Sequence, residues 1–281
     1  MDVARQGSAD QTERWNGATG CAWVEEQETV DQMYQPIEDL LVDAIVASAP
    51  RRVLDVGCGT GGTTVAVARR LGANADCIGV DISEPMLGAA RARAERMGTP
   101  ATFIRADAQS YPFEPSSVDA IMSRFGVMFF DDPVEAFANL RRAARAGADL
   151  RFVAWRGPDE NPFMTTAERA AAPILPNVPP RVPDAPGQFG FADSKRVRRI
   201  LDESGWTDID IQPIDVECAF PGTELTRYVM RFGPVGQLLH DTEEPTRVRV
   251  VERVRAAFEP YVHGSEVRFV AACWMMGARA P

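Results

Sequence analysis

A glycine cluster near the N-terminus has the spacing of a nucleotide-binding turn. Within VLDVGCGTGG, the residues Gly57, Gly59 and Gly61 form a G-x-G-x-G pattern. With Gly62 in place of Gly61, the same stretch contains G-x-G-x-x-G, the pattern of dinucleotide binding. Asp55 stands two residues before the first glycine. The glycines alone therefore permit two classes of ligand.

Three aspartates decide between these ligands. A dinucleotide would bring its phosphates close to Asp55, and like charges about 4 Å apart repel by roughly 4 kcal/mol at an effective dielectric near 20. S-adenosylmethionine has no phosphate, and its ammonium group can pair with Asp55 directly or through water. Asp81 can accept the ribose hydroxyls, and Asp107 can accept the adenine amino group. The carboxylates thus favour S-adenosylmethionine over a nicotinamide dinucleotide.

The elements that position these residues alternate between short apolar strands and helices from about residue 52 to residue 155. The expected strands are RVLDV, CIGVD, TFIRA, VDAIMS and DLRFVAW. Ser83 and Asp132 are expected to cap the helices that follow the second and fourth strands. This alternation predicts a parallel sheet covered by helices. Ligands of such sheets bind beyond the carboxyl ends of the strands, where the three aspartates lie.

The same residues carry a family resemblance. VLDVGCGTGG, Asp81 in VDIS, DAQSYPF and SRFGVMFF together resemble the class I S-adenosylmethionine-dependent methyltransferases. The chain is most similar to the branch with the ubiquinone/menaquinone-biosynthesis C-methyltransferases and bacterial small-molecule methyltransferases. The resemblance covers about residues 52–155, and one departure is ARAGAD, where many relatives have a basic-Pro-Gly-Gly turn. It implies an α/β Rossmann-like fold, a seven-stranded, mostly parallel sheet with an antiparallel last strand, and a helical and loop cover.

The chain outside the core is expected to cover the site. Residues 157–193 are rich in proline and contain large apolar residues, which favours a packed cover loop over a disordered linker. The expected divisions are an N-terminal helical segment over the cofactor site (1–50), the cofactor-binding core (51–156), the cover loop (157–193), a core helix and strand (194–220), a helical insertion (221–264) and the last core strand (265–281).

The expected cofactor contacts follow from the motifs. Ile82 and Met86 could enclose the adenine and ribose. Trp15, Trp23 and Tyr34 could lie over the sulfonium and attract it by cation–π interaction, or their helix could simply pack on the sheet edge. The predicted cofactor-binding set is Asp55, Gly57, Cys58, Gly59, Thr60, Gly61, Asp81, Ile82, Met86, Asp107, Ala108, Ser123, Trp15 and Trp23.

The expected methyl acceptor is a small, largely apolar or aromatic molecule. Its predicted contacts are Arg124, Phe125, Met128, Tyr228 and Phe232, with further lining from Phe129, Phe130, Phe163, Phe189, Phe191 and Met230. These residues could instead form the core of the cover. Arg124 could orient an anionic group or bridge to Asp131 or Asp132. His240 and His263 are candidate general bases, but no catalytic residue is assigned.

The amino-acid composition limits the partners, metal sites and cellular location that we expect. The formal net charge of −10 argues against nucleic-acid binding, even with a basic run around Arg198. Five scattered cysteines indicate neither a metal site nor disulfides. The sequence has no signal peptide or membrane-spanning run, so we expect a cytoplasmic protein. The oligomeric state stays open. The alternatives are a nicotinamide-dependent oxidoreductase and a non-catalytic S-adenosylmethionine-binding protein.

Overall fold

One twisted sheet organises the chain in the computed structural model, which describes residues 11–281 apart from 176, 179 and 241. The strand order is β3-β2-β1-β4-β5-β8-β6, and β7 pairs with β8 beside this path. The strands are β1 (Arg52–Val56), β2 (Asp76–Asp81), β3 (Ala101–Arg105), β4 (Val118–Arg124), β5 (Ala144–Trp155), β6 (Thr207–Pro221), β7 (Val262–His263) and β8 (Glu266–Arg279).

The direction of the strands confirms the predicted Rossmann-like fold. Strands β1 to β5 run parallel, and β8 lies antiparallel between β5 and β6. The main path therefore has the seven strands expected, and the two-residue β7 is an addition. The parallel strands are apolar and buried because helices cover both faces, as in β1, where Val53 and Leu54 are buried.

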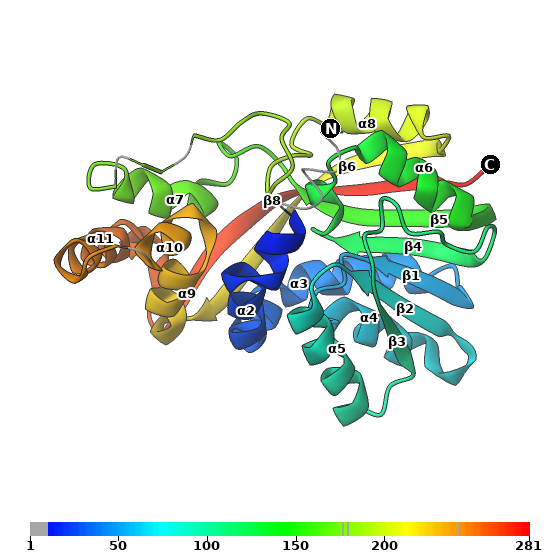
Figure 1. Cartoon of the computed structure of the whole chain (residues 1–281), viewed down its shortest axis with the longest axis horizontal. Helices are drawn as coiled ribbons and strands as arrows, with labels where there is room; N and C mark the ends of the chain where they lie inside the picture. The colour runs from blue at the N-terminus through cyan, green and yellow to red at the C-terminus, as the bar shows by residue number, and fades with distance from the viewer. Residues whose placement is uncertain (1–10, 176, 179, 241) are drawn as a thin grey trace.

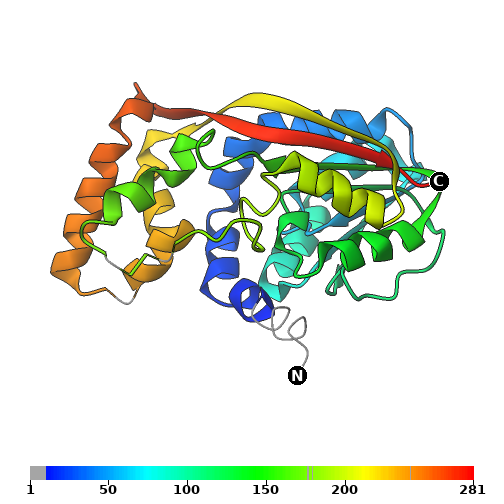
Figure 2. The same cartoon turned by 90° about the horizontal axis from the view of Figure 1, so that it is seen from above.

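Helices lie on both faces of the sheet, with α6 and α8 together on one face and α3 and α4 on the other (Figures 1 and 2). The helices that cover the sheet are α3 (Gln27–Val46), α4 (Gly62–Leu71), α5 (Glu84–Arg96), α6 (Pro133–Ala143) and α8 (Ser194–Glu203). The predicted caps are confirmed: Ser83 Oγ accepts from the Met86 amide, and Asp132 accepts from the Glu135 amide. The caps fix where α5 and α6 begin, directly after β2 and near the end of β4.

Beyond the end of β5, β6 and β8 continue as a two-stranded ribbon, and the cover helices lie at its far end. The pairing of β5 with β8 stops at Trp155 and Cys273, but β6 and β8 stay paired as far as Pro221 and Glu266. The cover helices gather at this end of the ribbon (Figure 1). They are α7 (Pro162–Ala171), α9 (Leu225–Arg231), α10 (Gly233–His240) and α11 (Glu244–Ala257).

Two contacts hold α7 on the ribbon. The Asn161 side chain donates to the Ala272 carbonyl and accepts from the Ala272 amide, each at 2.9 Å. The ring of Phe163 stacks on Phe269 with centroids 3.9 Å apart. The first part of residues 157–193 therefore packs on the ribbon and includes the helix α7.

The structure differs from the sequence-based expectation at the start of β5. The strand was expected as DLRFVAW, but it begins earlier, because residues 144–149, where many relatives have a turn, already belong to β5; the register against β4 shifts between Val118 and Ala120. Gly147 has φ +78° and donates its amide to the Ala280 carbonyl. A glycine at a bulge replaces the expected turn because only glycine adopts this conformation at low cost.

Candidate functional site

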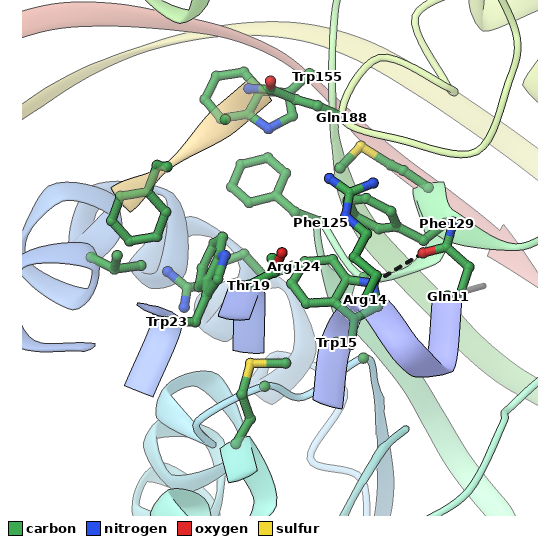
Figure 3. A pocket seen from close by; sticks show the side chains of 18 of the residues that line it. Gln11, Arg14, Trp15, Thr19, Trp23, Arg124, Phe125, Phe129, Trp155 and Gln188 are labelled. Atoms are coloured by element: carbon green, nitrogen blue, oxygen red, sulfur yellow. Dashed lines mark hydrogen bonds between the residues drawn. The ribbon is translucent and has the colours of Figure 1, made fainter. Parts of the chain in front are cut away.

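A cavity of about 290 Å³ opens at the carboxyl ends of the parallel strands, between the sheet and the cover (Figure 3). Its wall includes Gly57 after β1, Asp81 at the end of β2, Asp107 after β3 and Arg124 at the end of β4. These residues are distant in sequence, and the parallel sheet brings them to one edge. The cavity is therefore at the position that the strand ends predicted.

The glycine turn is built for close backbone contact. Gly57 has φ +66°, and a Cβ atom there would lie 2.6 Å from the Cα atom of Gly126. The Gly57 amide donates to the Val80 carbonyl at 2.8 Å. Any side chain at Gly57 would push the β4 loop away, so a glycine is required at this position.

Asp81 fixes the turn from the neighbouring strand. Its Oδ2 atom accepts from the Gly59 amide at 2.8 Å and its Oδ1 atom from the Ser83 amide at 2.9 Å. Burial raises the pKa of Asp81, and these amides act in the opposite direction. The carboxylate therefore faces the cavity while it holds the glycine turn and the start of α5.

Asp55 lies beneath the cavity wall and is only 1% exposed. Its Oδ2 atom accepts from the Thr64 hydroxyl at 2.6 Å, whereas its Oδ1 atom is buried and has no hydrogen-bond partner among the described residues. Burial raises the pKa of Asp55 to about 7, and the nearby Arg124 partly offsets this. The buried Oδ1 atom, without a hydrogen-bond partner among the described residues, suits a cation above the turn.

The predicted adenine end of the site is also on the cavity wall. Asp107, Ala108, Ile82 and Met86 all line the cavity. The Oδ1 atom of Asp107 accepts from the Gln109 amide at 2.9 Å. This hydrogen bond holds the segment after β3 in a turn, which keeps the Asp107 carboxylate beside the wall.

The N-terminal helices close the cavity from the side opposite the sheet. Trp15 and Trp23 line it, and Figure 3 shows both rings beside the opening. The Ser83 hydroxyl donates to the Trp15 carbonyl at 2.6 Å, and the Asn16 side chain donates to the Ile82 carbonyl at 3.0 Å. The segment before α2 (Ala18–Glu25) is thereby fastened to the end of β2.

An aromatic cluster fills the other half of the cavity. Phe125 stacks on Trp155 with centroids 4.7 Å apart and planes 8° apart, and the Tyr34 ring meets both at steep angles. Phe125 has φ +65°, a left-handed conformation that is unfavourable for a bulky residue. A strained backbone therefore holds this ring against Trp155.

The cover completes the aromatic half. Met128, Phe163, Tyr228 and Phe232 line the cavity. The Tyr228 hydroxyl donates to the sulfur of Met164 at 3.7 Å, and burial raises the pKa of Tyr228. This half of the cavity is therefore mostly apolar.

Five predicted cofactor residues do not line the cavity: Asp55, Cys58, Thr60, Gly61 and Ser123. The Ser123 hydroxyl donates to the Val56 carbonyl and accepts from the amides of Gly126 and Val127. A Cβ atom on Gly61 would lie 2.8 Å from Ala90. Ser123 and Gly61 thus support the walls of the site from behind.

Several expected lining residues lie elsewhere. Phe189, Phe191 and Met230 do not line the cavity, and Phe191 instead packs in the core against Phe137 and Phe152. His263 is exposed on β7. The side chain of His240 lies outside the described part of the structure.

The expected bridge from Arg124 to Asp131 or Asp132 is replaced by another pair. Arg124 lies 3.9 Å from Glu38 of α3, and Asp132 caps α6. Sequence reasoning missed Glu38 as this partner, because nothing local places α3 beside β4. It also missed Arg14 and Trp155 on the cavity wall. The position of Trp155 at the end of β5 was a usable signal, whereas Arg14 gave none.

The structure shows no metal site or membrane helix in its described part. Across residues 11–281, gaps aside, no three His, Cys, Asp or Glu side chains are grouped to hold a metal ion. Within the same residues, no helix combines the length and the apolar character that a membrane span requires.

Known proteins show the same combination of motif and fold. A family model described as a methyltransferase domain matches residues 53–147. A demethylmenaquinone methyltransferase of Thermus thermophilus is 34% identical over 122 residues, which cover 43% of this chain and 55% of that protein. Another from Renibacterium salmoninarum is 27% identical over 184 residues, covering 63% of this chain and 75% of that protein.

The fold is shared more widely than the sequence. The YcgJ protein of Bacillus subtilis superposes with a TM-score of 0.55 at 16% identity, over 86% of this chain and 98% of that protein. The sequence similarity is concentrated in the core, and the match spans little more than half of the Thermus protein. The matched methyltransferase domain ends at residue 147, so the cover helices lie outside it.

Proposed function

We propose that this chain is a class I S-adenosylmethionine-dependent methyltransferase and that it transfers a methyl group to a small, largely apolar or aromatic molecule, with support from the matched methyltransferase domain and the similar methyltransferases. One observation carries the proposal: carboxylates from the strand ends and aromatic rings from the cover line a single cavity. A polar half suits the cofactor, and an apolar half suits the acceptor.

The residues of the polar half fit S-adenosylmethionine. The buried carboxyl group of Asp55 lies behind the cavity wall and has an oxygen without a hydrogen-bond partner among the described residues, so we assign it an indirect role, as a negative charge that favours the ligand's ammonium group at the glycine turn. Asp81 is placed to accept from the ribose hydroxyls, and Asp107 from the adenine amino group. We assign the adenine faces to Ile82 and Met86.

The glycine turn and its supports complete this half of the proposed site. Gly57 and Gly59 approach the ligand through the backbone, and we assign Thr60 to the support of this turn. Cys58, Gly61, Ser123 and Ala108 shape the walls around it. Trp15 and Trp23 lie over the proposed sulfonium position, where a cation–π interaction is worth about 0.5 to 2 kcal/mol.

The acceptor is assigned to the aromatic half. Phe125, Met128, Tyr228 and Phe232 form its walls, with Arg124 between this half and the glycine turn. Such a lining holds an apolar or aromatic molecule by burial of its surface, at about 25 cal/mol per Å². The few polar groups would then set its orientation.

Catalysis in this arrangement depends on alignment. When bound, the cofactor supplies a methyl group already activated on a sulfonium. The chain's task is to hold the acceptor in line with the methyl–sulfur bond and to exclude water. The aromatic walls and the fastened N-terminal segment serve that purpose. We assign no general base, and the division into N-terminal segment, core, cover loop and helical insertion is part of the proposal.

Calorimetry tests the cofactor half directly. S-adenosylhomocysteine is expected to bind with a Kd in the micromolar range, about −8 kcal/mol, and NADH is expected to give no heat. A screen of small aromatic acceptors with methyl-labelled S-adenosylmethionine then tests transfer. Binding of NADH without binding of S-adenosylhomocysteine would contradict the proposal, and cofactor binding without transfer to any acceptor would favour a non-catalytic binding protein.

A further inference from the structure

Most charged side chains on the aromatic side of the cavity are compensated within the protein. Arg231 lines the cavity and pairs with Glu25 at 2.6 Å. Glu168 also lines it, and Arg181 donates to both of its carboxylate oxygens, at 2.5 and 3.1 Å. These two pairs leave no net charge for a ligand to neutralise.

Arg124 is also surrounded by negative charge. It lies 3.9 Å from Glu38, and it is close enough to the Asp55 carboxyl to influence its pKa. Its Nη1 atom is buried and has no hydrogen-bond partner among the described residues. Arg124 lines the cavity beside the glycine turn, and the carboxyl groups of Glu38 and Asp55 lie near its charge.

Arg14 is the exception. It lines the cavity at an exposed position, and its guanidinium lies 5.7 Å from the centroid of the Trp15 ring. Among residues 11–281, leaving aside the three undescribed positions, no carboxylate forms an ion pair with Arg14. Partial burial lowers the pKa of Arg14, because its guanidinium loses hydration. Figure 3 shows Arg14 beside Trp15 at the edge of the cavity.

We propose that the methyl acceptor carries a carboxylate, which pairs with Arg14 at the rim while the rest of the acceptor lies in the aromatic half. The proposal rests on the methyltransferase function proposed above. In a chain with net charge −10, a cation on the cavity wall that forms no ion pair with a described carboxylate is a specific feature. A guanidinium binds a carboxylate through two parallel hydrogen bonds, and one guanidinium matches one negative charge.

The ion pair between the acceptor's carboxylate and Arg14 would also help to hold the N-terminal segment over the cavity. Arg14 belongs to the segment that Ser83 and Asn16 fasten to the end of β2. A carboxylate bound at Arg14 would add a second attachment point for this segment, through the acceptor. The correct acceptor would thereby help to hold the N-terminal segment closed during transfer.

The test uses the full chain saturated with S-adenosylhomocysteine and two probes of equal shape, 2-naphthoate and 2-naphthamide. Calorimetry should show that naphthoate binds at least tenfold more tightly than naphthamide. Arg14→Met should reduce this ratio to within about twofold, and Arg14→Lys should retain part of it. Arg96→Met, which removes the same charge from an exposed site on α5, should leave the ratio unchanged.

The outcomes separate this inference from the proposed function. Equal binding of the two probes, no binding of naphthoate, or a ratio that survives Arg14→Met would overturn the carboxylate proposal if S-adenosylhomocysteine still binds. Failure of S-adenosylhomocysteine to bind the unaltered chain would overturn the proposed function and this inference together. Titration of S-adenosylhomocysteine into Arg14→Met shows whether the variant keeps the cofactor half intact.

Discussion

Asp55→Asn is expected to make the ligand-free protein more stable at pH 8 while it weakens cofactor binding. The pKa of Asp55 is about 7 in the folded protein, against an ordinary value of 3.8, and burial is the main cause. The folded state therefore holds the proton more tightly than the unfolded state does. Stability that the protonated carboxyl group provides is present at low pH and is lost as the pH rises from about 4 to about 7.

The magnitude follows from the two pKa values. The difference between about 7 and 3.8 corresponds to about 4 kcal/mol at pH 8, at about 1.4 kcal/mol for each tenfold change in proton affinity. About 2 to 3 kcal/mol of this cost develops between pH 5 and pH 8. Asparagine carries no charge and keeps one oxygen for the Thr64 hydroxyl, so it avoids most of the cost.

Urea denaturation at both pH values measures this effect. The gain in unfolding free energy of Asp55→Asn over the parent should be larger at pH 8 than at pH 5 by about 2 to 3 kcal/mol. The exposed Asp43 is a matched control, since Asp43→Asn should change stability by under about 0.5 kcal/mol at either pH. At pH 8, calorimetry should show at least about tenfold weaker binding of S-adenosylmethionine to Asp55→Asn, about 1.4 kcal/mol. A variant that is no more stable than the parent at pH 8 would refute the reasoning about burial.

Substitutions at three further positions test other parts of the site. Asp81→Ala should weaken S-adenosylhomocysteine binding by about 1.5 to 3 kcal/mol in calorimetry and Asp81→Asn by less, whereas an unchanged Kd would reduce Asp81 to a support of the turn. Phe163→Ala should lower the unfolding free energy by about 3 to 5 kcal/mol in urea, and a loss below about 1 kcal/mol would mean that the cover is not packed on the ribbon. Ser83→Ala should lower stability by about 1 to 2 kcal/mol and speed proteolysis near Trp15, and equal proteolysis rates would count against the fastened N-terminal segment.

The sequence predicted best the positions of those cavity residues that directly follow a parallel strand. Asp81 and Asp107 lie on the cavity wall because each follows a strand of one sheet, and strand ends meet at one edge whatever the rest of the chain does. The caps at Ser83 and Asp132 were predictable for a similar reason, since a capping hydrogen bond spans only three residues.

Features that depend on long-range packing were not predictable. Glu38 meets Arg124 only because α3 crosses the sheet, and no local pattern encodes that crossing. Phe191 was expected in the cavity, but an apolar residue in a loop fits a core or a cavity equally well by composition. Gly147 was expected at a turn, and the same positive φ serves a bulge instead. The sequence specifies which residues are small, apolar or charged, whereas tertiary contacts decide which surface each one joins.

Because β8 lies between β5 and β6 in the sheet, β6 can pair only after the last part of the chain has been synthesised. Strand β6 has no neighbour in the sheet other than β8, and β8 begins 45 residues after β6 ends, at Glu266 after Pro221. While the ribosome makes α9, α10 and α11, β6 has no strand to pair with, and an unpaired strand is a site for aggregation. Asp208, Asp210, Asp215 and Glu217 are exposed along β6. These negative charges disfavour the pairing of β6 with another chain until β8 has been synthesised.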